Sequence, residues 1–395
     1  MRPIITVLAV NTGSSSIKFS LYECGVAEEL LFTGSLTRIG LKEGRFSVMD
    51  PEGNFIDCEK VEVPDHHAAC KHVFSWIQAH GHAMPDAIGH RIVHGGPRHT
   101  APEKVTPELL ASIEELIPYA PEHLPQALKA IGHAAVRFPG VLQVACFDTA
   151  FHRSMPAVAK LYPIPEPYRS EGVQRYGFHG LSYEFILGEL TAQREKLARK
   201  GRLIFAHLGH GASMAALRDG RSVETTMGFS PAGGMVMGTR TGDLDPGVIL
   251  FLLKQGRLTP GGLREMVNRK SGLLGVSGLS DDMRDLLEAE KGNKLAHAAV
   301  ELFCYQARKQ IGALSAVLGG LDMLVFTGGI GEYAAEIRSR ICAGLEFLGI
   351  RIDPEKNRGN LAVISPDSGP VIVKVMKTNE ELMIVRQTRR IIEGH

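Results

Sequence analysis

The sequence predicts an α/β protein built from two related halves. A strand, a turn of small polar residues and a returning strand occur at residues 7–21 and again at residues 202–217. A third segment, residues 322–332, leads from a buried strand through glycines into a helix. The chain has 395 residues, which is enough for two domains that each bury a core. The repeat therefore predicts two domains of similar plan, each with its own hairpin.

The first hairpin has the composition of a phosphate-binding turn. The turn offers the Asn11 amide, the hydroxyls of Ser14 and Ser16, the backbone N–H groups around Gly13 and the Lys18 ammonium. Several donors beside one cation suit a phosphate group, although the G-x-x-x-x-G-K-[ST] pattern of a Walker A loop is not present. The alternative is a plain polar hairpin, and this segment alone does not decide between the two.

The second hairpin and the later glycine segment repeat this chemistry. Residues 202–208 form an apolar strand, residues 209–213 a turn, and residues 214–217 the returning strand, followed by an Asp-Gly hairpin signal at 219–220. After the strand at 322–327, glycines at a helix N-terminus mark a common place for a nucleotide. We expect one helix there, with Ile337, Ile341, Leu345 and Leu348 on one face and Gly349 as its end.

The chain is expected to end in a helix over residues 379–392. Thr378 and Glu381 have the spacing of a capping box, which would fold Glu381 back onto the cap and leave Glu380 for another role. Residues 295–318 predict a long core helix, and Asp245 with Pro246 predicts the start of another.

Composition argues against several classes of function. A net charge of +1 gives no field that would attract nucleic acid or an anionic membrane. No apolar run approaches the ~20 residues needed to span a bilayer. The six cysteines have no metal-ligand spacing, and scattered free thiols indicate a reducing cytoplasm. His66 and His67 are expected to be solvated loop residues.

Charged side chains follow several predicted strands. Arg91 precedes two glycines, Asp148 ends an apolar strand, His179 lies between glycines, and Arg240 lies in a flexible loop. Each one alone is explained by a surface ion pair, a cap or a satisfied buried histidine. Together with three phosphate-type loops they predict phosphoryl transfer between two anionic substrates, because cations must hold both and neutralise the moving group.

Seven motifs, in order from about residue 5 to 386, resemble the acetate kinase family. They read N-T-G-S-S-S-x-K-F, H-R-x-V-H-G-G, F-D-T-A-F-H, R-Y-G-F-H-G, M-G-T-R-T-G-D-L-D-P, F-T-G-G-I-G-E and T-N-E-E-L. The resemblance implies an α/β fold of two duplicated ribonuclease H-like domains, as in the actin, Hsp70 and sugar kinase superfamily, with the active site in the cleft between them. The implied domains are residues 1–148 with 382–395, and residues 149–381. The implied activity is reversible, Mg²⁺-dependent phosphoryl transfer from ATP to acetate by a cytoplasmic homodimer, with Mn²⁺ as a possible substitute.

The resemblance also assigns site residues. It implies Asn11 and Glu380 as metal ligands, Arg91 as the clamp on the substrate carboxylate, and Asp148, His179 and Arg240 as catalytic residues. Because a carboxylate acceptor is already ionised at pH 7 and needs no general base, we expect Asp148 to orient the metal, its waters or an arginine.

Further assignments concern the apolar pocket for the acetate methyl group and the nucleotide. The pocket would be lined by Val93, Phe178 and Pro231. The phosphates of ATP would meet Ser14, Ser16, Lys18, His207, Leu208, Gly209, His210 and Gly211. The adenosine would lie among Asp282, Met283, Arg284, Gly329, Ile330, Gly331, Glu332 and Tyr333.

Three residues depart from the family pattern. His210 and Tyr333 stand where the family usually has asparagine, which leaves the phosphoryl donor open. Glu122 replaces a leucine of the methyl pocket, and a carboxylate there would be costly to bury unpaired, so either Glu122 turns away or the acceptor differs. The alternatives are a kinase for propionate or another short carboxylate and, in a different class, a nucleotide-driven ATPase of the Hsp70 or actin type. The set of Arg91, His179 and Arg240 argues against the latter.

Overall fold

The computed structural model describes residues 4–80 and 84–394, which form two compact units. Unit 1 contains the described residues up to 151, residues 180–185 and residues 379–394, and unit 2 contains residues 152–179 and 186–378. The chain therefore passes between the units at 151/152, 179/180, 185/186 and 378/379. The domain limits implied by the resemblance stay a prediction.

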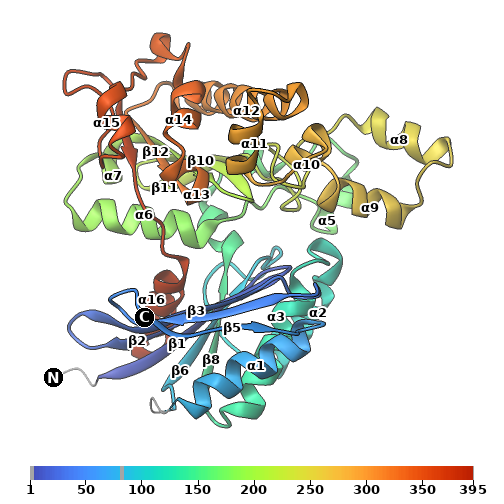
Figure 1. Ribbon diagram of the computed structural model, residues 1–395, viewed down its shortest axis with the longest axis vertical. Coiled ribbons are helices and arrows are strands. Elements are labelled where there is room, and N and C mark those ends of the chain that lie inside the picture. The colour runs from blue at the N-terminus through green and yellow to red at the C-terminus, as the bar shows by residue number, and fades with distance from the viewer. Residues whose placement is uncertain (1–3, 81–83, 395) are drawn as a thin grey trace. The chain divides into compact units, whose positions relative to one another are not determined.

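Unit 1 is built on an eight-stranded sheet in the order β5-β4-β3-β2-β1-β6-β8-β7 (Figure 1). The first five strands are antiparallel neighbours, whereas β6 and β8 run parallel to β1 and β7 closes the edge antiparallel to β8. The strands are β1 (Ile5–Thr12), β2 (Ser16–Cys24), β3 (Glu28–Thr37), β4 (Gly44–Met49), β5 (Phe55–Val61), β6 (Ala87–Ile92), β7 (Glu103–Lys104) and β8 (Leu142–Phe147). The predicted strand, turn and returning strand are confirmed as β1 and β2.

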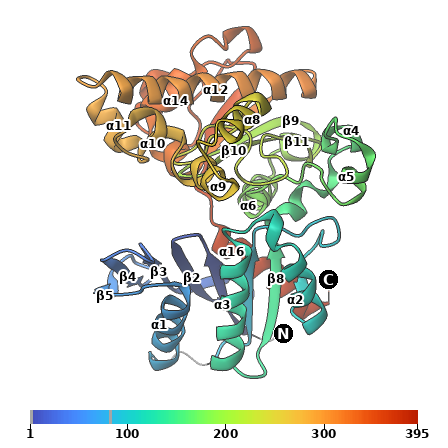
Figure 2. The same cartoon turned by 90° about the vertical axis from the view of Figure 1, so that its right-hand side faces the viewer.

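Helices cover both faces of this sheet. Figures 1 and 2 show α1 (His66–Ala79) and α3 (Leu124–Arg137) on one face and α16 (Glu380–Glu393) on the other. Between β7 and α3 lie α2 (Pro107–Glu115) and the 3₁₀ turn η1 (Ile117–Tyr119), and a second 3₁₀ segment, η2 (Asp148–Ser154), follows β8.

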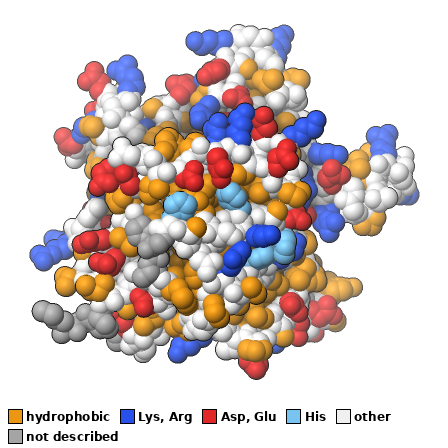
Figure 3. Space-filling view, turned by 60° about the horizontal axis from the view of Figure 1, so that its bottom comes forward, with side chains coloured by type: hydrophobic (Ala, Val, Ile, Leu, Met, Phe, Trp, Pro, Cys, Tyr) orange, Lys and Arg blue, Asp and Glu red, His pale blue; other side chains and the backbone are white. Residues whose placement is uncertain are grey.

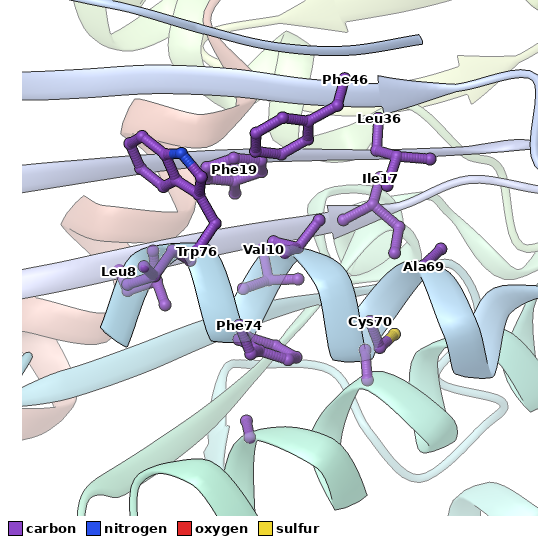
Figure 4. Packing of buried hydrophobic residues seen from close by; sticks show 14 of the residues in the cluster. Leu8, Val10, Ile17, Phe19, Leu36, Phe46, Ala69, Cys70, Phe74 and Trp76 are labelled. Carbon is purple, nitrogen blue, oxygen red and sulfur yellow. The ribbon is translucent and has the colours of Figure 1, made fainter. Parts of the chain in front are cut away.

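The main core of unit 1 lies between the sheet and α1. Figure 4 shows Phe74 and Trp76 of α1 beside Val10 and Phe19 of the sheet. The apolar side chains of β2, Ile17, Phe19 and Leu21, are buried here. His66, expected in a solvated loop, is instead the buried first residue of α1, whose N-cap is Asp65.

Unit 2 repeats the plan of unit 1 with a five-stranded sheet in the order β11-β10-β9-β12-β13. Its three antiparallel strands and two parallel strands correspond to β3-β2-β1-β6-β8 in both order and direction. The strands are β9 (Arg202–Leu208), β10 (Ala212–Arg218), β11 (Arg221–Thr225), β12 (Met323–Thr327) and β13 (Ile372–Val375). The predicted duplication is thereby confirmed.

The long helix α12 (Lys294–Leu318) packs against β9, β10 and β11 and is the predicted core helix. The prediction of a single helix after Gly328 is wrong, because the helix is interrupted at Ala334. It consists of α13 (Gly328–Tyr333), α14 (Ala335–Cys342) and the 3₁₀ turn η3 (Glu346–Leu348), which ends at Gly349 in the left-handed conformation. The remaining helices are α4 (Ala157–Lys160), α5 (Glu166–Ser170), α6 (Gly180–Ala192), α7 (Leu197–Lys200), α8 (Pro246–Lys254), α9 (Pro260–Arg269), α10 (Gly272–Ser277), α11 (Met283–Ala289) and α15 (Pro354–Arg358).

The capping box predicted for the last helix is wrong. Asn379, not Thr378, is the N-cap of α16, and its side chain accepts the N–H of Leu382 at 2.8 Å. The Glu381 side chain therefore does not serve the cap and instead accepts a hydrogen bond from Asn11.

The distribution of charged side chains on the surface agrees with the net charge of +1. Figure 3 shows acidic and basic side chains mixed over one face of the molecule. Among the described residues, no helix combines the length and the hydropathy that crossing a membrane requires.

Gly89 of β6 sets how closely α16 approaches the sheet. A Cβ on Gly89 would overlap the Thr388 hydroxyl and the Ile384 side chain of α16. We expect Gly89→Ala to destabilise unit 1 by about 1–3 kcal/mol, because the helix must move away from the sheet. The measurement is urea unfolding followed by Trp76, the chain's one tryptophan, which lies in the core of unit 1.

Gly132→Ala is the matched control. Gly132 lies inside α3, and a Cβ there meets nothing within 4 Å. It should leave stability unchanged or raise it by up to about 1 kcal/mol. Equal effects of the two substitutions would contradict the role given to Gly89.

Candidate active site

Unit 1 gathers charged side chains at one edge of its sheet. Asn11 is near the end of β1, Arg91 is near the end of β6, and Asp148 directly follows β8. Because these strands are parallel, their carboxyl ends lie at the same edge. The first turn of α16 adds Glu380 and Glu381 to the cluster.

Arg91 is the centre of this cluster. Its Nε and one terminal nitrogen donate to Asp148 Oδ2 at 3.0 and 2.6 Å, and its other terminal nitrogen donates to Asn11 Oδ1 at 3.0 Å. That nitrogen also lies 3.6 Å from Glu380 Oε2. Asn11 Nδ2 in turn donates to Glu381 Oε1 at 2.9 Å and to Glu380 Oε2 at 3.1 Å.

The carboxylates keep Arg91 charged although it is mostly buried. Burial works to lower the pKa of Arg91, but the charges of Asp148 and Glu380 raise it above its ordinary value. Burial raises the pKa of Asp148, and the Arg91 guanidinium opposes that rise. The pair is thus a buried ion pair whose arginine has a fixed orientation.

The same cluster contains the oxygen atoms that a divalent metal needs. Asp148 Oδ1 is buried and makes no hydrogen bond of ordinary geometry to the described residues, although the Leu181 N–H favours its ionised form. Glu380 and Glu381 converge on Asn11 from the first turn of α16. Within residues 4–80 and 84–394, no three His, Cys, Asp or Glu side chains could hold a metal by themselves. Water and phosphate oxygens would have to complete the shell of such an ion.

The first phosphate-type turn lies next to this cluster in the chain. Asn11 pairs with Lys18 across the β1–β2 ladder, and Lys18 and Ser14 are exposed while Ser16 is half-buried. The turn is closed by the Gly13 N–H, which donates to the Ser16 carbonyl at 2.8 Å. The imidazole of His66 holds the Gly13 carbonyl at 2.9 Å, a contact that the sequence analysis missed because His66 is distant in the chain.

Unit 2 holds His179 in a strained backbone conformation. His179 is the N-cap of α6 and has φ of 58°, in the left-handed region that few non-glycine residues adopt. Its Nδ1 lies 2.8 Å from Ser213 Oγ, and its ring stacks on His207 with centroids 4.2 Å apart. These two contacts fix the ring and offset the backbone strain.

Arg240 and the second phosphate-type turn lie beside His179. The turn, residues 209–211, joins β9 to β10, and a Cβ on Gly211 would lie 3.2 Å from His179 Nε2 and 3.7 Å from a terminal nitrogen of Arg240. Arg240 donates to the Pro231 carbonyl at 3.1 Å. The glycine at 211 thus lets the histidine, the arginine and the turn converge.

The start of α13 packs directly on this turn. Gly328 has φ of 76°, and a Cβ there would press against the Leu208 backbone. The Gly329 N–H lies near Gly209 on the other side. Strand β12, its glycines and the turn after β9 therefore form one backbone surface.

A pocket of about 530 Å³ opens beside this surface. Its apolar lining comes from Met283, Leu287, Ile330 and Ala334. Tyr333 lines it with 71% of its surface exposed. The full lining is Gly209, His210, Asp281, Asp282, Met283, Arg284, Leu287, Gly329, Ile330, Tyr333 and Ala334.

The polar side chains of the pocket are paired with one another. His210 Nε2 lies 3.0 Å from Asp281 Oδ2. Asp282 is the N-cap of α11, and hydrogen bonds from Arg284 hold its pKa below the usual range. Asp281, Leu287 and Ala334 were not predicted, and they lie beside the segments 282–284 and 329–333 that were assigned to the adenosine.

Not every predicted nucleotide contact lines this pocket. His207 and Leu208 end β9 and Gly211 lies in the turn that follows, whereas Gly331 and Glu332 are buried in α13. Of the residues expected around the methyl group, Val93 and Phe178 are buried and Pro231 is buried beside Arg240. Glu122 is half-buried in unit 1.

The structure thus places the predicted residues in two sets, one in each unit. Unit 1 holds Asn11, Ser14, Ser16, Lys18, Arg91, Val93, Asp148 and Glu380. Unit 2 holds Phe178, His179, residues 207–211, Pro231, Arg240 and the pocket residues. Glu381, Ser213 and His66 are additional members that contact them directly.

Comparison with known proteins gives matches over almost the whole chain. Residues 6–386 match the family described as the Acetokinase family. The acetate kinase of Rhodopseudomonas palustris strain TIE-1 is 43% identical, and the match covers 98% of each chain. The crystal structure of Porphyromonas gingivalis acetate kinase is 38% identical with a TM-score of 0.87, covering 98% of this chain and 100% of that one. A propionate kinase from Francisella tularensis is 34% identical with a TM-score of 0.90, covering 98% and 99%.

His152 holds the backbone of Phe178, the residue before His179, and should make the stability of unit 2 depend on pH. Its Nε2 donates to the Phe178 carbonyl at 3.1 Å, its Nδ1 lies 2.9 Å from Ser222 Oγ, and burial lowers its pKa from 6.5 to about 4. Between these values the unfolded chain binds a proton that the folded chain does not. The free energy of unfolding should therefore fall as pH falls from about 6.5 to about 4. Above that range His152 is neutral in both states and adds no pH dependence.

His152→Gln keeps a donor for the carbonyl and removes the titration. Urea unfolding followed by circular dichroism should show a smaller loss from pH 7 to pH 4 in this variant, by up to about 3 kcal/mol. His90 in unit 1, whose pKa burial also lowers to about 4, will still contribute in both proteins. Identical pH dependence in the two proteins would contradict the neutral, buried state of His152.

Proposed function

The chain belongs to the acetokinase family, and we infer that it is a kinase that transfers the terminal phosphoryl group of ATP to acetate, reversibly, giving acetyl phosphate and ADP. The match over residues 6–386 carries this conclusion. The geometry supports it, because a carboxylate-held arginine in unit 1 suits a small anion and the pocket in unit 2 suits a nucleoside. We propose that the two sets of residues act on the same pair of substrates.

We propose Arg91 as the clamp on the acetate carboxylate. Asp148 holds two of its nitrogens and so fixes the plane of the guanidinium. The acetate oxygen that attacks phosphorus is already ionised, and Asp148 acts as the positioning partner of Arg91 rather than as a base. Val93, Phe178 and Pro231 are proposed to face the methyl group.

We propose His179 and Arg240 as the groups that stabilise the moving phosphoryl. Both side chains carry N–H donors, and Ser213 and the Pro231 carbonyl hold them beside the glycine turn. Charge that spreads over the equatorial oxygens is best stabilised by donors that are already in place. Lys18, Ser14 and Ser16 are proposed to hold the terminal phosphates.

A divalent metal is implied by the family, and we propose Mg²⁺, with Mn²⁺ as a substitute. Glu380 and Glu381 supply carboxylate oxygens beside Asn11, which matches the hard-oxygen preference of these ions. When bound, the metal neutralises charge on the terminal phosphates.

The pocket favours a nucleoside triphosphate over a bare polyphosphate as donor. A donor made only of phosphate would gain nothing from the apolar lining of Met283, Leu287 and Ile330. We propose that Tyr333, which replaces the usual asparagine, stacks on the base. His210, paired with Asp281, is proposed to flank the phosphates without taking the place of the glycine N–H groups.

A hydroxamate assay with ATP and Mg²⁺ tests the function. Acetate should give acyl hydroxamate, and omission of either ATP or metal should abolish it. Propionate and butyrate in parallel test the second candidate, a propionate kinase. Its grounds are the similarity to the Francisella tularensis propionate kinase and the replacement of a leucine of the family pattern by Glu122. No product with any of the three acids would refute the proposed function.

We propose that the protein is a cytoplasmic homodimer joined through α8 and α9. The helix α8 reads PGVILFLLK, and neither it nor α9 has a buried residue. Val248, Leu250 and Phe251 are 41%, 66% and 52% exposed, and Figure 1 shows both helices extending away from the sheet of unit 2. A second copy would cover this apolar surface. The six free cysteines suit a reducing compartment.

Arg240→Ala should lower kcat by about a thousandfold, because phosphoryl transfer loses a donor that acts in the transition state. The KM for ATP should change much less. The control is Arg221→Ala, an exposed arginine of β11 in the same unit. If kcat stays within about twofold of the wild type, Arg240 lies outside the transition state.

Phe251→Asp should separate the proposed dimer. Light scattering after size exclusion should give twice 42.9 kDa for the wild type and 42.9 kDa for the variant, since a buried carboxylate without a partner is costly. Phe347→Asp, at a position that is 78% exposed on η3, is the control and should stay dimeric. A monomeric wild type would overturn the assignment.

A further inference from the structure

Glu332 is buried in the nucleotide-binding region but does not face the pocket. Its side chain belongs to α13, and the residue is 7% exposed. One oxygen, Oε1, accepts the Gly328 N–H at 3.0 Å, the Thr378 N–H at 3.1 Å and the Thr327 hydroxyl at 3.4 Å. The carboxylate thus joins the start of α13 to a residue 46 positions later in the chain.

The short helix α13 is also held at its other end. A terminal nitrogen of the buried Arg338 donates to the Gly331 and Glu332 carbonyls, both at 2.9 Å. Arg338 is itself fixed by Asn357, whose side-chain oxygen accepts from its Nε at 2.8 Å. Because Arg338 holds α13 independently, loss of the Glu332 carboxylate should leave the pocket largely formed.

Thr378 is the last residue of unit 2. The crossings at 151/152 and 185/186 lie inside η2 and α6, and the crossing at 179/180 lies at the N-cap of α6. At 378/379, by contrast, residues 376–379 are neither helix nor strand. Loop residues between two units are the positions where changes of φ and ψ are most easily accommodated. Glu332 restrains this segment through its hydrogen bond from the Thr378 N–H.

On the far side of this crossing, the chain is anchored in unit 1. Asn379 donates from Nδ2 to the Tyr22 hydroxyl at 3.2 Å and caps α16 through Leu382. The next residues, Glu380 and Glu381, are the carboxylates hydrogen-bonded to Asn11. A single peptide bond therefore separates the residue held by Glu332 from the N-cap of the helix that carries them.

We propose that Glu332 is a positioning residue that couples occupation of the nucleotide pocket to the first turn of α16. Nucleotide bound against α13 steadies the Glu332 carboxylate, which steadies Thr378 and, through the next residue, Glu380 and Glu381. This coupling rests on the proposed function, in which Glu380 and Glu381 bind the divalent metal. By reciprocity, an ordered first turn of α16 also favours nucleotide binding.

Hydrogen exchange with and without ADP, in the absence of metal, tests the coupling without requiring activity. The reporters are the N–H groups of Leu382 and Met383, which bond to Asn379. ADP should slow their exchange about fivefold or more in the wild type and have little effect in Glu332→Ala. Equal protection by ADP in both proteins would overturn the proposal.

Kinetics provide the second readout. With saturating substrates, Glu332→Ala should lower kcat by about tenfold, because the Thr378 N–H loses its acceptor and the first turn of α16 loses its restraint. The Kd for metal-free ADP, measured by calorimetry, should change by less than about twofold, since Arg338 keeps α13 in place. If instead the Kd rises as much as kcat falls, Glu332 merely shapes the pocket and the proposal fails.

Three variants sharpen the result. Glu332→Gln keeps the Oε1 acceptor that makes all three contacts and should behave as the wild type, so impairment equal to that of Glu332→Ala would assign the effect to charge and contradict the proposal. Glu336→Ala removes an exposed glutamate of α14 paired with Arg340 and should change neither readout. If Glu332→Ala does not fold, Glu332→Asp replaces it, because its shorter side chain cannot reach both N–H groups.

The two claims fail separately. A wild type that makes no acyl phosphate refutes the proposed function, whereas the exchange experiment still decides the coupling. An active wild type without ADP-dependent protection of Leu382 and Met383 refutes the coupling alone.

Discussion

The guanidinium of Arg91 brings together side chains from four elements of unit 1: β1, β6, the segment after β8, and α16. A buried cation is tolerated only where carboxylates and hydrogen-bond acceptors surround it. Asp148 meets that requirement with two hydrogen bonds, and Asn11 links the arginine to both glutamates of α16. The last helix of the chain therefore contributes to this cluster as well as to the fold, and Gly89 permits its close approach to the sheet.

In unit 2, the surface that we propose for the phosphates is built mainly from backbone groups. Glycines at 209, 211, 328 and 329 allow the turn after β9 and the start of α13 to pack directly on each other. His179 and Arg240 then reach the same turn from separate loops, and each is held by a neighbour that has no charge. The apolar pocket lies beside this surface, so the place proposed for the nucleoside adjoins the place proposed for its phosphates.

The sequence predicted the elements whose local pattern is strong. The hairpins at β1–β2 and β9–β10 followed from alternation and small-residue turns, and α12 followed from its long apolar periodicity. The helix after Gly328 was predicted too long, because periodicity does not reveal that Arg338 is buried against the carbonyls at the end of α13. The capping box failed for a related reason. Asn379 competes for the same cap, and Asn11 offers Glu381 a better partner that is 370 residues away in the chain.

By itself, the sequence determined which chemistry the chain carries: the strand-and-turn repeat, the glycines at the phosphate-type turns and the charged residues that follow the strands. These features are local, and each leaves a pattern within about ten residues. Only the tertiary structure decided how the groups are partnered. Arg91 on Asp148, His66 on Gly13 and Glu332 on Thr378 join positions from 46 to 57 residues apart, and Asn11 meets α16 from the other end of the chain. Such pairs arise because buried charges and N–H groups must find partners wherever the packed sheets bring them, and no local pattern records that outcome.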